Sequence, residues 1–123
     1  MSQAFDVHIV NIPLGAFSGA TEFPFVYLPD TGGGITVLSA HLGGTAAGTA
    51  IGGKLVTMSD AGTPAINGTI GAFAGTVVTA AGVVFAATIA TAYVGGGKWI
   101  GFDQTSGTIP AGSWLALSYV MGK

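Results

Sequence analysis

Residues 71–97, GAFAGTVVTAAGVVFAATIATAYVGGG, contain no charged side chain, and the uncharged run extends from just after Asp60 to just before Lys98. A run of this length is sufficient for a transmembrane helix, which needs about 20 consecutive apolar residues. Gly71 and Gly75 also have the GxxxG spacing of packed membrane helices. The fold of the whole chain therefore depends on whether this stretch spans a membrane or forms buried strands.

Three features of the stretch favour strands. It is rich in the β-branched residues valine, threonine and isoleucine, which prefer extended backbone. Leucine, the usual bulk of a membrane span, is absent between Leu55 and Leu115. Asp60 on one side and Lys98 on the other give no positive-inside signal. We therefore predict buried strands and no membrane association.

The composition indicates a protein that buries its surface against other proteins. The 123 residues are 50% hydrophobic and only 7% charged, whereas an ordinary soluble domain is about 25% charged. Three lysines, no arginine and a net charge of −2 exclude a phosphate-binding patch, so we expect no nucleic-acid partner. The N-terminal residues MSQAFDVHIVNIP lack the pattern of a secretory signal, which predicts synthesis and assembly in a cytoplasm.

The chain divides into short apolar runs that are bounded by Gly, Pro, Asn or Asp, the pattern of an all-β sandwich or barrel. About eight strands are expected: 4–14, 22–28, 34–42, 54–59, 69–78, 82–94, 98–103 and 113–121. We predict a single domain, an antiparallel β-sandwich over residues 13–123, preceded by an N-terminal arm or first strand over residues 1–12.

Two local expectations follow from the pattern. The stretch GGTAAGTAIGG (43–53) is a low-complexity Gly/Ala/Thr segment, which predicts a loop. In the run EFPFVYL (22–28), strict alternation places Phe23, Phe25 and Tyr27 on one face of a strand.

The residues available for chemistry are few. Asp6 and His8 share one face of the first expected strand and have the spacing of an acid–base pair, but a solvated strand face is the favoured explanation. His41 has no acid or third histidine at ligand spacing that would complete a metal site with His8. No glycine-rich segment is followed by the Lys-Ser/Thr of a phosphate cradle. We therefore expect no enzymatic activity, no metal and no cofactor.

The C-terminal third combines a strand that follows a glycine turn, GKWIGFD (97–103), an Ile-Pro-Ala-Gly loop (109–112) and a last apolar strand, SWLALSYVM (113–121). With the chain length, the low charge and the richness in Gly, Ala, Thr and Val, this arrangement resembles the small jelly-roll β-sandwich proteins of tailed bacteriophage virions, the capsid decoration (cement) proteins and related fibre tip domains. The resemblance implies a homotrimer on the capsid surface of the virion that clamps neighbouring subunits of the major capsid protein.

Two groups of residues are candidates for protein contacts. They are the N-terminal arm (Phe5, Val7, Ile9) and the aromatic face (Phe23, Phe25, Tyr27). The alternative function is a tail or head fibre tip that binds host-surface carbohydrate by stacking on aromatic rings. Its candidate residues are Tyr27, Tyr93, Trp99, Trp114 and Tyr119.

Overall fold

The computed structural model describes residues 6–14, 17–18, 21–30, 33–44, 49–59, 65–73, 84–109 and 112–122. Its ten strands are β1 (His8–Pro13), β2 (Phe17–Ser18), β3 (Thr21–Leu28), β4 (Ile35–Gly43), β5 (Thr49–Ser59), β6 (Ile66–Phe73), β7 (Val84–Ile89), β8 (Tyr93–Val94), β9 (Lys98–Ile109) and β10 (Trp114–Met121). Eight of these strands are long, and β2 and β8 have two residues each. The all-β prediction is confirmed.

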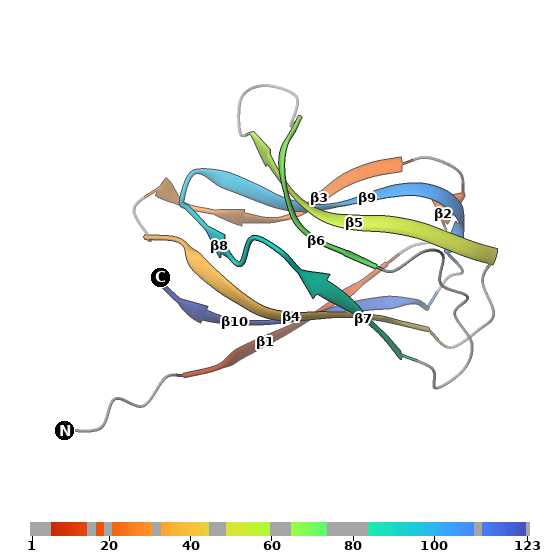
Figure 1. The fold of residues 1–123 in the computed structure, drawn as a ribbon, viewed down its shortest axis with the longest axis horizontal. Coiled ribbons are helices and arrows are strands. Elements are labelled where there is room, and N and C mark those ends of the chain that lie inside the picture. The colour runs from red at the N-terminus through yellow and green to blue at the C-terminus, as the bar shows by residue number, and fades with distance from the viewer. Residues whose placement is uncertain are drawn as a thin grey trace.

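All strand pairs are antiparallel and belong to one sheet that is nearly closed into a barrel (Figure 1). The order is β1-β10-β4-β7-β6-β5-β9-β2, with β3 also paired to β9 and β8 paired to β4. Figure 1 shows the sheet as two layers, with β1, β10, β4 and β7 below and β3, β9 and β5 above. The sheet stays open between β1 and β3, which have no pairing with each other.

Strand β7 connects the two layers. Its first half pairs with β4 of the lower layer, where Val84 lies opposite Gly43. Its second half pairs with β6, where Ile89 lies opposite Gly71. A strand that changes partner halfway along its length is how orthogonal packings form a corner. One side of the molecule is therefore closed by continuous strand pairing, whereas the opposite side, between β1 and β3, is not.

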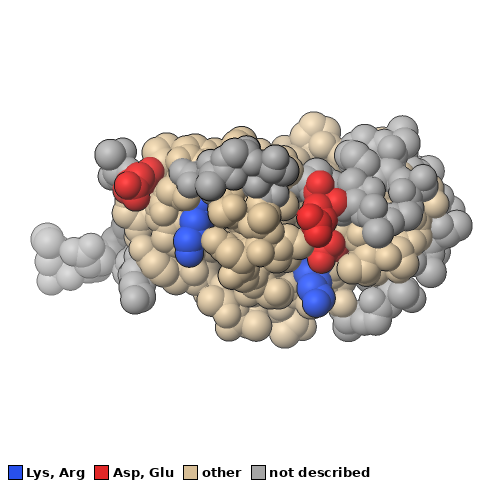
Figure 2. Space-filling model, turned by 90° about the horizontal axis from the view of Figure 1, so that it is seen from above, with Lys and Arg blue, Asp and Glu red and all other residues tan. Residues whose placement is uncertain are grey.

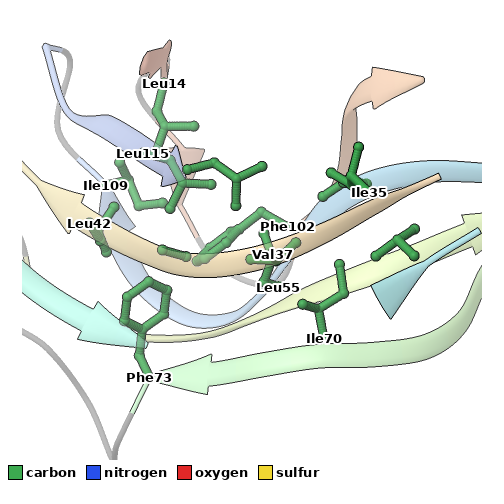
Figure 3. Close-up of a cluster of buried hydrophobic side chains, with 14 residues drawn as sticks. Leu14, Ile35, Val37, Leu42, Leu55, Ile70, Phe73, Phe102, Ile109 and Leu115 are labelled. Atoms are coloured by element: carbon green, nitrogen blue, oxygen red, sulfur yellow. The ribbon is translucent and has the colours of Figure 1, made fainter. Parts of the chain in front are cut away.

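The core lies between the two layers. Its buried side chains come from both of them and form one cluster (Figure 3): Leu14, Ile35, Val37, Ala40, Leu42, Leu55, Ile70, Phe73, Val94, Ile100, Phe102, Ile109, Leu115 and Leu117. Phe102 is fully buried, and its ring lies 6.2 Å from the ring of Phe73 at a tilt of 55°. At about 25 cal/mol per Å2 of buried apolar surface, this cluster is the main source of stability.

The described part of the uncharged stretch, residues 71–73 and 84–97, consists of strands and the turns between them. It contains the end of β6, all of β7 and β8, and the turn before β9, while residues 74–83 lie outside the described part. In β7, the partly buried Phe85, Ala87 and Ile89 alternate with exposed residues and pack against the core. Among the described residues, no helix has the length and hydropathy needed to span a bilayer.

The predicted loop at residues 43–53 is wrong at both ends. Gly43 still belongs to strand β4 and pairs with Trp114. Strand β5 already begins at Thr49, and Gly53 pairs with Gln104 of β9. A Cβ atom on Gly53 would lie 2.3 Å from Cζ of Phe102. Glycine is needed at this position because the Phe102 ring lies over the strand. The low-complexity composition predicted a loop because it does not indicate this packing. Residues 45–48 of the prediction lie outside the described part.

A β-bulge in β3 changes the expected alternation of the aromatic residues. Pro24 pairs with Gly101 and Val26 with Ile100, so Phe25 is the extra residue of a β-bulge. Two residues of a bulged strand then lie opposite one on its neighbour, which shifts the alternation beyond that point. As a result Phe25 packs against the core, whereas Tyr27 lies 41% exposed. The two side chains do not form one aromatic face.

Candidate functional site

The outer surface of the lower layer is the candidate site. Register places its residues in three rows across the strands: Ile9–Ser118–Ser39, Asn11–Ala116–His41–Ala86, and Pro13–Trp114–Gly43–Val84. The rows between them, which include Val10, Leu117 and Ala40, point to the core. We call these outward residues, together with Val7 and Leu38, the neutral face.

The neutral face contains no acidic residue, lysine or arginine, because β1, β10, β4 and β7 contain none. The charged residues found within described strands are Glu22, Lys54, Lys98 and Asp103, all in β3, β5 or β9. Figure 2 views the molecule from the side of these upper strands and shows acidic and basic side chains there. The charged residues of the described strands are therefore confined to one layer, and the strands of the other layer contain none. Asp6, which directly precedes Val7, and Asp30 lie outside the strands.

A shallow groove of about 410 Å³ crosses the neutral face, lined by Val7, Ile9, Ser39, His41, Ala116, Leu117 and Ser118. Val7 is 54% exposed and Ile9 is 72% exposed. The hydroxyl groups of Ser39 and Ser118 are hydrogen-bonded to each other at 2.5 Å, and His41 is a further polar side chain in the lining. The groove thus offers apolar contact and small side chains and contains no charged group.

The indole ring of Trp114 covers the part of the neutral face around Gly43. A Cβ atom on Gly43 would lie 2.3 Å from Cζ2 of Trp114, so the indole ring lies directly over the glycine backbone. Beside the ring is a second hollow of about 470 Å³, lined by Asn11, Pro13, Gly112, Ser113 and Trp114. Trp114 therefore combines a large apolar contact area with a polar N–H group, the combination that is enriched in protein interfaces.

A separate cleft of about 250 Å³ lies at the open side of the sheet. It is lined by Val10, Val26, Tyr27, Leu28, Ile35, Leu117, Tyr119 and Met121. The Tyr27 ring lies 5.2 Å from Trp99 at a tilt of 56°, and the Tyr119 ring stacks on His8 at 5.3 Å. The cleft lies between β1 and β3 and is lined by apolar and aromatic side chains.

The predicted contact residues separate in the structure. Val7 and Ile9 lie exposed on the neutral face, and Tyr27 lines the cleft instead. Phe25 packs against the core. Phe5 and the side chain of Phe23 lie outside the described part of the chain, although the backbone of Phe23 pairs with Phe102.

The histidines are not brought together for chemistry. His8 shares its side of β1 with Val10 and stacks on Tyr119, whereas His41 lies on the neutral face with Ala116 beside it. Among the described residues, no group of three histidine, cysteine or acidic side chains is placed to hold a metal ion.

Most of the neutral face was not predicted from the sequence. Its residues come from four segments far apart in the chain, and they form one surface only because these segments are adjacent strands in the sheet. One sequence signal was available: the runs 35–43, 84–89 and 114–121 contain no charged residue. Comparison with family models, with curated proteins and with solved structures gives no match to this chain.

Proposed function

We propose that this protein is a structural virion protein, a capsid decoration protein with a jelly-roll β-sandwich fold. The strand order supports this fold. Without the two-residue strands, the eight long strands numbered along the chain lie in the orders 1-8-3-6 and 2-7-4-5 in the two layers. These orders support the proposed fold, because a jelly roll consists of eight strands in two sheets that are joined by two Greek keys, and it is a fold found in viral capsid proteins.

The neutral face carries the functional part of the proposal. A surface without charge has no ionic groups to desolvate, so contact with another apolar protein surface gains about 25 cal/mol per Å2. Association itself costs several kcal/mol, and repeated attachment along a lattice overcomes that cost through many equivalent contacts. The charged upper layer would then face water and keep the decorated particle soluble.

The partner in this proposal is the major capsid protein, and the location is the outer surface of the capsid. The resemblance implies a homotrimer, but the proposed function does not depend on that oligomeric state. Self-association and capsid binding are separate properties, and each is measured separately.

Capsid binding tests the proposal directly. Purified protein is mixed with undecorated capsids, and the bound amount is measured after sedimentation. We expect saturation at a fixed ratio to capsid subunits and a rise in the capsid melting temperature. Leu38→Glu places a charge on the exposed bulge of the neutral face, and we expect it to weaken binding about tenfold or more.

Ile66→Glu is the matched control, because Ile66 is exposed to a similar degree on β6, outside the neutral face. It should bind like the unmodified protein. An equal loss of capsid binding in both variants would argue against the neutral face as the binding surface. Absence of capsid binding by the unmodified protein would argue against a decoration protein.

The cleft favours one alternative, a tail or head fibre tip that binds host-surface carbohydrate. Tyr27 and Tyr119 line the cleft with their rings, and aromatic faces are suitable platforms for sugars. Binding to cells or lipopolysaccharide that is lost in Tyr27→Ala, together with no affinity for capsids, would select this alternative.

A further inference from the structure

The two strands that border the open side of the sheet differ in how well their edges are protected. Strand β3 contains Pro24, Glu22 and the bulge at Phe25. Proline, charge and bulges are the devices by which natural sheets prevent an edge from pairing with another chain. Strand β1 pairs with β10 without a register shift and contains no charged residue, and its one proline, Pro13, is the last residue of the strand.

The free backbone groups of β1 can be assigned from one hydrogen bond. The Leu14 amide donates to the Ser113 carbonyl at 2.8 Å, and hydrogen bonding in an antiparallel pair alternates along the strand. The amide and carbonyl groups of Ile9 and Asn11 therefore point away from β10. Pro13 lies two residues after Asn11, so its backbone also points away from β10. The N–H group that proline lacks would therefore not have bonded to β10.

Exposed apolar side chains flank this edge on both surfaces of the sheet. Val7 and Ile9 lie on the neutral face, and Met121, 58% exposed, lies on the cleft side. A second strand that pairs with β1 would cover apolar surface in addition to forming backbone hydrogen bonds.

We propose that β1 pairs with β1 of a second copy of this chain, in antiparallel orientation about a two-fold axis. With the axis at Val10, Ile9 of one copy lies opposite Asn11 of the other, and about four backbone hydrogen bonds form between them. The inference does not require capsid binding and goes beyond the proposed function.

Three observations favour a second copy as the occupant. The strands and their free groups are self-complementary under a two-fold axis, as an isologous interface requires. The lower layer contains no charge that would repel an identical layer. The pairing also places the two neutral faces side by side in one continuous sheet, which doubles the surface available to a flat partner.

The solution mass of the unmodified protein gives the first test. We expect a species of twice 12.1 kDa that dissociates on dilution. Hydrogen exchange measured above and below the dissociation concentration should show slowed exchange of the Ile9 and Asn11 amides in the dimer. A monomer at all concentrations, a trimer, or unprotected Ile9 and Asn11 amides would overturn the proposal.

A pair of variants at Asn11, an exposed residue, gives the second test. Asn11→Pro removes a free-edge amide without removing a bond to β10, so we expect a folded chain whose dimer is weakened about tenfold or more. Asn11→Ala keeps the amide and should dimerise normally. Equal dimerisation of the two variants would overturn pairing through β1. A monomeric protein that still decorates capsids would separate this result from the proposed function.

Discussion

Gln104 is the most deeply buried polar side chain of the described core, with no exposed surface. Its Nε2 group donates to the carbonyl oxygens of Gly107 at 3.0 Å and Ser106 at 3.4 Å. Its Oε1 atom is buried and has no hydrogen-bond partner among the described residues. Two carbonyl acceptors at one end of the side chain mean that only a donor is tolerated in that position.

Gln104→Glu should make the stability of the protein depend on pH. A buried carboxylate beside two carbonyl oxygens is disfavoured, so the pKa of the new carboxyl is raised in the folded state. The folded state then binds more protons than the unfolded state, and stability falls as pH rises above the unfolded pKa of about 4.3. We expect a loss of about 3 kcal/mol at pH 7 relative to pH 4, measured by denaturant unfolding.

Gln104→Met is the control for this experiment. It removes the same hydrogen bonds but introduces no ionisable group, so its loss of stability should not depend on pH. A Glu variant whose loss is equally independent of pH would show that the carboxylate is hydrated and that position 104 is not closed to water.

At the scale of the element, one row of charged residues crosses the upper layer. Lys54 of β5 lies opposite Asp103 of β9, which lies opposite Glu22 of β3. The single lysine thus stands at the end of a row that contains two carboxylates. Cross-strand neighbours of opposite charge contribute roughly 0.2–1 kcal/mol, and like charges are destabilising.

Lys54→Glu should therefore lower the free energy of unfolding by about 1 kcal/mol at low salt, because all three charges of the row become negative. The deficit should shrink as salt is added, since screening acts strongly on exposed groups. Lys54→Gln removes the positive charge without adding a negative one, so its free energy of unfolding should lie between those of the unmodified protein and Lys54→Glu. Denaturant unfolding at two salt concentrations measures the effect, and equal stability of both variants at low salt would contradict it.

Element type was predictable from the sequence, whereas strand pairing was not. The β-branched composition of the uncharged stretch correctly predicted strands in its described part, and Ile35 and Val37, which alternate with Thr36, are buried while Thr36 is not. The bulge at Phe25 could not be predicted, because the sequence EFPFVYL does not specify whether β9 follows the strand residue by residue.

The candidate site shows the same division. Val7 and Ile9 were predictable as apolar residues at the start of the chain. Their neighbours Ser39, His41 and Ser118 were not, because only the sheet order places β1, β10 and β4 side by side. No local property of a small residue such as Ser118 indicates which strand it will face.

At the scale of the whole molecule, the first and last strands depend on each other. Strand β10 lies between β1 and β4, so Leu115 and Leu117 of β10 are covered only when all three strands are in place. Contacts of this kind join residues that are far apart in the chain, and such topologies form cooperatively and slowly.

Removal of residues 114–123 should abolish the cooperative unfolding transition, because it leaves β1 without a partner and opens the core between the layers. Removal of residues 1–6, which precede β1, should leave the transition within about 1 kcal/mol of the full chain. Near-ultraviolet circular dichroism with thermal melting distinguishes these outcomes. A cooperative melt of the chain that lacks β10 would show that the remaining strands form an independent unit.

The corner strand β7 has a consequence for motion. Because it is paired with β4 along one half and with β6 along the other, it acts as a fixed hinge for the two layers. We therefore expect fluctuations to separate β1 from β3 more readily than they open the corner at β7, because only the corner is closed by backbone hydrogen bonds. A small hydrophobic dye or a xenon atom would enter by that route, and tethering β1 to β3 would close it.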